Sequence, residues 1–221
     1  MATLLLRLAG PLQAWGVDSK FETRRTERMP TKSGVLGMVA AALGRRRDAD
    51  LSDLSALRFG VRVDQEGSLL RDFHTAHSEK SAYVTERWYL ENAVFLVGLE
   101  SGDTTFLEKL RDALKNPVYP LYLGRRSCPP ELPLVLDIVP EPLLTALREY
   151  PWLAAEWWRK KHPAALLRLT ADAEPGESGG LQRDVPISFD PAGRQFGWRK
   201  VRTFPPVPVG MTDEHDPMSE L

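Results

Sequence analysis

The sequence holds one cysteine in 221 residues, which excludes an internal disulfide framework and fits a reducing compartment. It also lacks any apolar run that approaches the roughly 18 residues of a membrane span. The short apolar run in MATLLLRLAG is broken by Arg7. A secretory signal needs a longer apolar stretch after its positive charges, so we interpret this run as a strand. These absences predict a soluble, cytoplasmic protein with no membrane partner.

Signatures of common enzymes are missing as well. The sequence contains no dinucleotide-binding G-x-G-x-x-G, no serine-triad pattern and no paired catalytic carboxylates. The segment MPTKSGVLG resembles a phosphate-binding P-loop in its Lys32–Ser33 pair, but Glu27 stands where the first glycine is required. We therefore predict no cofactor, no metal site and no catalytic residue.

An excess of either sign of charge is lacking overall, because 29 Lys and Arg residues stand against 30 Asp and Glu and the net charge is −1, yet the basic residues are unevenly distributed. Between residues 20 and 47, two acidic residues stand against eight basic ones: Lys20, Arg24, Arg25, Arg28, Lys32, Arg45, Arg46 and Arg47. A second basic stretch, GRQFGWRKVR, lies near the C-terminus, and the final DEHDPMSEL predicts a loose acidic tail. A local basic concentration in a neutral chain is typical of a phosphate-binding face.

Hydrophobic periodicity predicts an α+β fold. Two extended arms, 68–77 and 82–90, surround the polar SEKS and predict a projecting hairpin, the thumb, over about 72–88. The other predicted elements, in chain order, are a strand at 3–10, a helix at 31–44, strands at 59–64 and 92–100, a helix at 103–117 and a strand at 132–139. This order is the split βαβ pattern of ferredoxin-like (RRM-like) domains.

The texture changes after about residue 140, where two short helices, a strand at 164–173 and proline-punctuated extended segments follow. We therefore predict two parts, a ferredoxin-like domain over 1–139 and a smaller, mostly β C-terminal lobe over 140–221.

The turn YLGRRSCPP, residues 122–130, follows the second predicted helix. Gly124 lets the backbone approach a ligand without hindrance from a Cβ. Arg125 and Arg126 supply bidentate phosphate contacts and planar stacking on bases. At the start of the first helix, the N–H groups of residues 32–34 are expected to be unpaired and to suit one or two phosphates, with help from Lys32. Together these features predict an RNA-binding α+β protein.

Other candidate residues have simpler interpretations. His74 and His77 could act as general acid and base in RNA cleavage, but surface or packing roles are commoner for such residues. Cys128 is best explained as a packed thiol beside Pro129. Trp15 and Trp198 lie inside basic segments and are candidates for base stacking, whereas the tryptophans at 152, 157 and 158 have the spacing of core or interface residues.

Four segments in order, LRLAGPLQAWG, RRTERMPTKSGVLGMVAAALGRRRD, LRDFHTAH and YLGRRSCPP, resemble the CasD family. This family is the small backbone-capping subunit of the type I-E CRISPR surveillance complex, Cascade, and belongs to the RAMP superfamily. The resemblance covers about residues 3–138, with a weaker echo at GRQFGWRKVR. RAMP proteins carry a glycine-rich loop after the second helix of a ferredoxin-like fold, and YLGRRSC stands in that position with a single glycine.

The resemblance implies a non-catalytic subunit that binds the 5′ handle of the CRISPR guide RNA (crRNA) and caps the backbone filament in antiviral defence. It also implies contact with the backbone subunit through the thumb, contact with the large PAM-reading subunit, and an indirect relation to target DNA. Two alternatives stay open: a metal-independent endoribonuclease that processes CRISPR repeat RNA, and a protein-interaction scaffold. The expected RNA-binding residues are Lys20, Arg24, Arg25, Arg28, Thr31, Lys32, Ser33, Arg45, Tyr122, Gly124, Arg125, Arg126 and Ser127.

Overall fold

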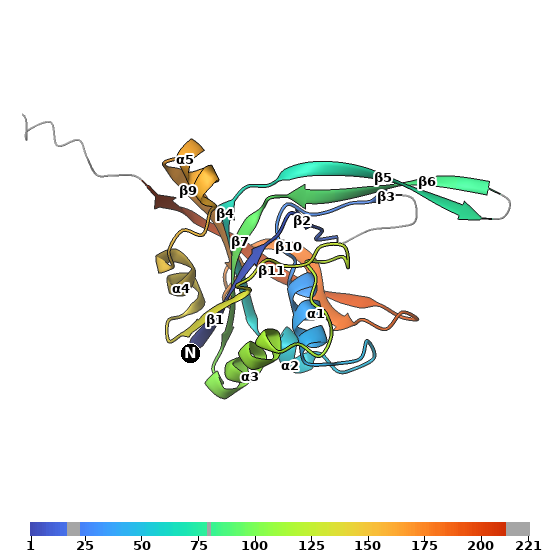
Figure 1. The fold of residues 1–221 in the computed structure, drawn as a ribbon. Helices are drawn as coiled ribbons and strands as arrows, with labels where there is room; N and C mark the ends of the chain where they lie inside the picture. The colour runs from blue at the N-terminus through green and yellow to red at the C-terminus, as the bar shows by residue number, and fades with distance from the viewer. Residues whose placement is uncertain (17–22, 79–80, 211–221) are drawn as a thin grey trace, which may run out of the picture.

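The structure is a computed structural model that describes residues 1–16, 23–78 and 81–210. Its fold is mixed α+β and is built on a large antiparallel sheet (Figure 1). The seven strands of this sheet lie in the order β10 (Gly180–Ser188), β11 (Gln195–Val209), β9 (Ala165–Asp172), β4 (Arg58–Gln65), β7 (Val94–Ser101), β1 (Ala2–Ala9) and β8 (Val135–Val139). Among the described residues, no helix is long and apolar enough to cross a membrane.

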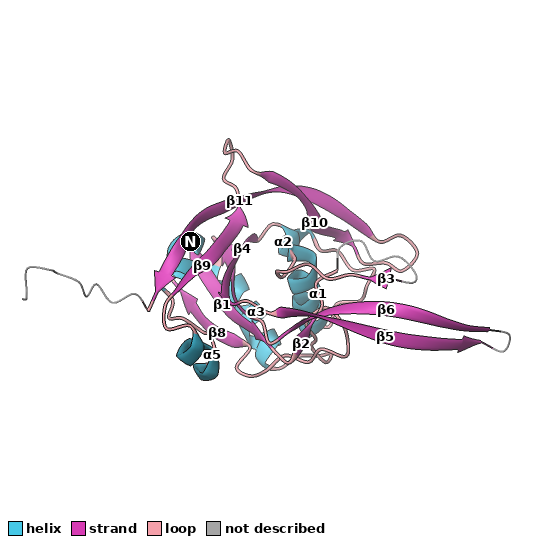
Figure 2. Cartoon of the chain, turned by 90° about the horizontal axis from the view of Figure 1, so that it is seen from above, coloured by secondary structure: helices cyan, strands magenta, loops and turns pink. Residues whose placement is uncertain are grey.

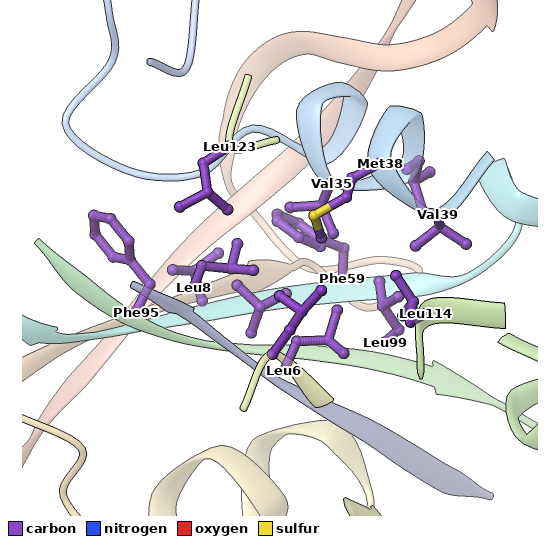
Figure 3. Close-up of a cluster of buried hydrophobic side chains, with 14 of the residues drawn as sticks. Leu6, Leu8, Val35, Met38, Val39, Phe59, Phe95, Leu99, Leu114 and Leu123 are labelled. Carbon is purple, nitrogen blue, oxygen red and sulfur yellow. The ribbon is translucent and has the colours of Figure 1, made fainter. Parts of the chain in front are cut away.

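Helices cover both faces of the sheet. One face carries α1 (Lys32–Ala42) and α3 (Thr104–Lys115), with the short α2 (Ser52–Ser55) beside them, and the other carries α4 (Leu143–Glu149) (Figure 1). Strand β1 is therefore buried on both sides: Leu4, Leu6 and Leu8 face α1 and α3, and Leu5 faces α4. Figure 3 shows side chains of α1 pointing toward those of β1, β4 and β7. This double burial explains why the strand reads as a continuous apolar run rather than an alternating one.

The ends of the two long helices agree with the capping residues in the sequence. The Thr31 side chain accepts a hydrogen bond from the Gly34 N–H at 3.2 Å, and Asp103 accepts one from the Phe106 N–H at 3.0 Å. After α1 the chain turns at Gly44 with a φ of +73°, a left-handed conformation in which glycine is favoured. These local signals are specific because each satisfies a backbone group that a helix end would otherwise leave unpaired.

A long hairpin of β5 (Ser68–Ser78) and β6 (Ser81–Glu91) is inserted between β4 and β7 and projects from the body (Figures 1 and 2). Its strands pair from Ser68–Glu91 to Ser78–Ser81, so it extends beyond the predicted 72–88 at both arms. Two short strands lie against its base: β2 (Leu12–Gln13) pairs with β6 antiparallel, and β3 (Thr23–Arg24) pairs with it in parallel. The sequence did not predict β2, β3 or α2.

The last part of the chain continues the main sheet. After α5 (Glu156–Lys161), β9 pairs with β4 through Gly60–Ala171 to Arg62–Leu169, and β11 and β10 follow it outward. The predicted strand at 164–173 is confirmed as β9. The proline-punctuated extended segment includes one 15-residue strand, β11, with a register shift between Phe204 and Val207, where Pro205 and Pro206 lie. The acidic tail predicted at the C-terminus falls on 211–221, outside the described residues.

Candidate nucleic-acid interface

The turn at 122–128 is folded tightly onto the N-terminal segment. The Leu123 N–H donates to the Cys128 carbonyl at 2.7 Å, and the Ala14 N–H donates to the Leu123 carbonyl at 3.0 Å. Gly124 has a φ of +85°, and a Cβ at this position would lie 1.7 Å from the Ala14 carbonyl oxygen. Glycine is therefore required for close contact with the chain's own backbone, whereas the sequence suggested close approach to a ligand.

Arg125 connects three segments that are distant in the sequence. Its guanidinium donates to the Trp88 carbonyl at 3.0 Å, and to the carbonyls of Arg24 at 2.9 Å and Arg25 at 3.3 Å. It also lies 4.7 Å from the centre of the Tyr89 ring. The guanidinium is thus occupied within the protein, whereas the sequence suggested that it contacts phosphates and bases. Arg126 is exposed and has no such contacts in the described part of the chain.

Tyr89 and Ser127 complete this junction. Burial would raise the pKa of Tyr89, but hydrogen bonds with Ser127 and Arg125 outweigh it and leave this pKa below its ordinary value. A lowered pKa means that the groups around the Tyr89 oxygen stabilise its ionised form. Arg125 above the ring and Ser127 beside it therefore hold the ring in place. The residues of the turn therefore fix the relative positions of the hairpin base and the 23–28 segment.

The junction brings two like charges together along the hairpin. In the parallel pairing of β3 with β6, Arg24 lies opposite Arg87. The Nε atom of Arg87 is buried and makes no hydrogen bond within the described residues. On its other side Arg87 lies opposite Asp72 of β5, so one carboxylate stands beside two arginines, and the remaining positive charge is destabilising unless a further anion neutralises it. Arg87 was not among the residues predicted from the sequence, because its importance depends on a pairing that the sequence does not reveal.

A groove of about 470 Å³ lies at the base of the hairpin, on the face opposite Arg87, because its β6 residues Glu86 and Trp88 alternate with Arg87 along the strand. Arg71 borders it, stacks over the rings of Phe73 at 4.7 Å and Trp88 at 5.7 Å, and forms an ion pair with Glu86. The groove combines cationic side chains with aromatic rings, and these are the two features by which proteins bind single-stranded nucleic acids. Its lining residues are Thr23, Arg25, Thr26, Leu69, Arg71, Glu86 and Trp88.

The start of α1 is already occupied. The Lys32 N–H donates to Asp184 at 2.8 Å, and the Lys32 ammonium donates to Asp172 at 3.0 Å. Its side chain is 6% exposed, and burial lowers the pKa of Lys32 in spite of the two carboxylates. The expectation of unpaired N–H groups at this helix start is therefore wrong, because an aspartate from β10 supplies the anion that the helix N-terminus favours.

The remaining predicted residues lie in different settings. Arg24, Arg25 and Arg28 are exposed beside the hairpin, Thr31 is the buried cap of α1, and Ser33 and Tyr122 are half-buried. Arg45 is half-buried, and its guanidinium pairs with Asp53 and donates to the Asp50 carbonyl at 2.9 Å. Lys20 lies outside the described residues.

The aromatic candidates and the basic candidates near the C-terminus also include both buried residues with internal partners and exposed residues. Trp15 is buried and donates to the Gln13 side chain at 3.0 Å, so its proposed stacking role is wrong. Trp198 is exposed. In the second basic stretch, Arg199 is buried between Asp172 and Asp184, and Arg202 pairs with Glu177. Part of the basic charge seen in the sequence is thus neutralised inside the protein.

The histidines do not form a joint site. His74 and His77 are exposed on β5, where they are an odd number of residues apart and therefore face opposite sides of the hairpin. Within the described ranges, no group of three or more His, Cys, Asp or Glu residues could hold a metal ion.

Cys128 is fully buried, and burial raises the pKa of its thiol. Because the thiolate is the reactive form, we expect the folded protein to react with a thiol reagent at pH 8 at least about tenfold more slowly than the urea-unfolded chain. Absorbance after addition of a disulfide-exchange reagent measures both rates. Equal rates in the two states would contradict this assignment.

Comparison with known proteins identifies the fold. A solved structure titled "Crystal structure of Cas protein" is 43% identical, with a TM-score of 0.72 over 93% of this chain and 95% of the other. A chain of a "CRISPR RNA-guided surveillance complex" is 34% identical, with a TM-score of 0.75 over 94% of this chain and 91% of the other. The molecule therefore has the fold of Cas proteins.

Sequence comparison shows to which family of Cas proteins the chain belongs. The family model described as "CRISPR-associated protein (Cas_Cas5)" matches residues 3–202. The curated "CRISPR system Cascade subunit CasD" of Escherichia coli (strain K12) is 42% identical over 156 residues, which cover 60% of this chain and 69% of that protein. The chain belongs to the Cas5 family of CRISPR-associated proteins, and its predicted resemblance to CasD is confirmed.

Proposed function

We propose that this protein is a non-catalytic subunit of a Cascade-type surveillance complex and binds the 5′ handle of crRNA. The observation that carries the proposal is the pairing of exposed Arg24 with Arg87 across β3 and β6, whose positive charge the single carboxylate of Asp72, opposite Arg87 on β5, balances only in part. An RNA phosphate at this position would neutralise both arginines. The similarity to a Cascade subunit and to a chain of an RNA-guided complex supports RNA as the source of that phosphate.

The binding surface that we propose, the handle surface, consists of Arg24, Arg25, Arg87 and Arg126. Arg125 positions it from behind and does not contact RNA. The shallow groove at the base of the hairpin then accepts an unstacked base against Trp88, with Arg71 nearby. Arg28 extends the same exposed segment, whereas Lys32 and Arg45 contribute through internal ion pairs.

We further propose that the core of this subunit is a ferredoxin-like unit over 1–139. The order β4-β7-β1-β8 of antiparallel strands, with α1 and α3 on one face, supports this assignment. In this proposal 140–221 is a smaller lobe that extends the sheet. The β5–β6 hairpin is the thumb that meets the neighbouring backbone subunit, and other surfaces meet the large PAM-reading subunit and relate the chain indirectly to target DNA.

The nuclease alternative receives no comparable support. His74 and His77 face opposite sides of the hairpin, so they do not act together on one phosphate as general acid and base.

We expect the double variant Arg24→Ala, Arg25→Ala to lose crRNA from the complex, because each side chain contacts a phosphate. The log–log salt dependence of RNA binding should become less steep by about 0.7 for each contact removed. The measurement is a pull-down of the tagged chain co-expressed with its genomic neighbours and a repeat array, followed by sequencing of RNA 5′ ends.

The matched control is Lys109→Ala, Lys115→Ala, which removes two exposed charges from α3. It should retain RNA with a uniform repeat-derived 5′ end. Equal RNA retention by both double variants would place the handle elsewhere on the chain.

A further inference from the structure

A second surface of unusual chemistry lies on α5. None of the six residues of this helix is buried, although two of them are tryptophans. Trp157 is 48% exposed, and Leu166 on the adjoining β9 is 59% exposed. Exposed tryptophan is costly in water and is enriched at binding sites, where the ring gains contacts on association.

The aromatic rings of α5 form an ordered platform. The His162 imidazole stacks on the Trp158 ring at 4.0 Å between centroids, with an angle of 23° between the planes. Trp157 and Trp158 meet edge to face at 5.8 Å. The His162 N–H donates to the Trp158 carbonyl at 2.9 Å, so the stack is fixed at the end of the helix. The half-exposed Trp157 ring therefore packs against an ordered neighbour.

Basic side chains surround this ring. The last turn of α5 contains Arg159, Lys160 and Lys161, and the Lys161 ammonium lies 5.7 Å from the Trp157 ring centre. The single acid of the helix, Glu156, pairs with Lys160 at 2.8 Å, but both side chains are about three-quarters exposed. A surface pair of this kind is weak and is readily exchanged for another anion. On β9, Arg168 is paired with Glu66.

The chain that leads into α5 is rigid. The Leu153 N–H donates to Asp64 at 2.7 Å, the Trp152 ring N–H donates to the Asp64 carbonyl at 2.7 Å, and the Ala155 N–H donates to Gln65 at 3.0 Å. These bonds attach the residues just before the helix to β4 at the centre of the sheet. A preorganised site loses less conformational entropy when a ligand binds.

We propose that the α5 surface, made of Trp157, Arg159, Lys160 and Lys161, binds a single strand of nucleic acid. A base would stack on Trp157, and the adjoining phosphates would pair with the basic side chains. This surface lies away from β3 and from the hairpin tip in both views (Figures 1 and 2). It is therefore a second nucleic-acid site, separate from the handle surface, and it requires no repeat sequence.

The test uses the full-length chain and fluorescently labelled 20-nucleotide strands of thymidine (DNA) and uridine (RNA), which contain no repeat. We expect Trp157→Ala to weaken binding at least about fivefold, the smaller of the effects reported for loss of a stacking ring, and Trp157→Phe to retain most of the affinity. Lys160→Ala with Lys161→Ala should make the log–log salt dependence less steep by about 1.4. The ratio of DNA to RNA affinity then identifies which strand in the complex is the natural ligand.

Controls separate this site from the handle surface. Lys109→Ala with Lys115→Ala should leave the affinity for these strands unchanged, and the fold-loss caused by Trp157→Ala should be the same with and without Arg24→Ala and Arg25→Ala. Unchanged binding by Trp157→Ala and by the Lys160, Lys161 variant would overturn the proposal. Binding of polyglutamate with the same dependence on Trp157 would overturn it in favour of an acidic protein partner. Both lysines are exposed, so their replacement tests the site even if Trp157→Ala fails to fold.

Discussion

Replacement of Arg62 with methionine is expected to lower the free energy of unfolding by about 3–5 kcal/mol, because it breaks a buried ion pair and leaves a carboxylate without a partner. Arg62 and Asp64 are both completely buried and lie next to each other on the same face of β4. The guanidinium donates twice to Asp64, at 2.7 and 2.8 Å, and also to the carbonyls of Leu147, Tyr150 and Pro151. All five of its N–H groups are therefore satisfied, and methionine would replace none of these bonds.

This loss should depend on pH in a defined direction. Burial raises the pKa of Asp64, and Arg62 opposes that rise. Without Arg62 the folded-state pKa of Asp64 lies still further above its value in the unfolded chain. A raised folded-state pKa means that the variant gains stability as pH falls through it. The difference in unfolding free energy between the two proteins is therefore largest at neutral pH and shrinks in acid.

Thermal and urea unfolding followed by circular dichroism measure the effect. A loss of this size corresponds to roughly 6–20 °C in melting temperature for a chain of this length. Arg168→Met is the matched control, because its ion pair with Glu66 is half-exposed and contributes at most about 1 kcal/mol. Equal losses in the two variants would contradict the special role of the buried pair.

Replacement of Arg199 with methionine should have an effect of similar size, about 3–5 kcal/mol, for a different reason. Arg199 on β11 bridges Asp184, at 2.5 and 2.8 Å, and Asp172, at 2.6 Å. Lys32 at the start of α1 pairs with the same two aspartates. The cluster has two positive and two negative charges, so removal of Arg199 leaves a buried excess of negative charge that one lysine does not balance.

The control for Arg199 is on the same strand. Arg202 pairs with Glu177, and both side chains are partly exposed. We expect Arg202→Met to change the free energy of unfolding by no more than about 1 kcal/mol. If Arg199→Met were as mild as this control in urea unfolding, the cluster would not hold β9, β10 and β11 to the start of α1.

The sequence predicted the regular elements well where the signal is local. The helices predicted at 31–44 and 103–117 are confirmed as α1, capped by Thr31 and followed by Gly44, and α3, capped by Asp103, because these residues act on backbone groups within four residues. The short strands β2 and β3 were missed because two residues carry no periodicity. They exist only because β6 offers its edge to them.

Among the signals in the sequence, clusters of basic residues were the poorest guide to which side chains form the site. Composition marks Lys32, Arg45 and Arg199 as members of basic clusters, but their partners, Asp172, Asp184 and Asp53, come from other parts of the chain. The same long-range pairing made Arg87 important without a local signature. A run of basic residues thus predicts the region of the chain that forms the site. Which of its side chains remain free to bind a ligand depends on which carboxylates the fold places beside them.

The pairing of β9 with β4 has a consequence for synthesis on the ribosome. A nascent chain that has emerged as far as β8 already holds β1, β4, β7 and the hairpin, but β4 is then an edge strand with unpaired backbone groups. It stays open until residues 169–171 emerge, more than a hundred residues after their partners at 60–62. Pairings between such distant segments form late, and an open apolar edge favours association with other chains. The order of translation therefore leaves the centre of the sheet open until β9 emerges, and only then can β11 and β10 extend it.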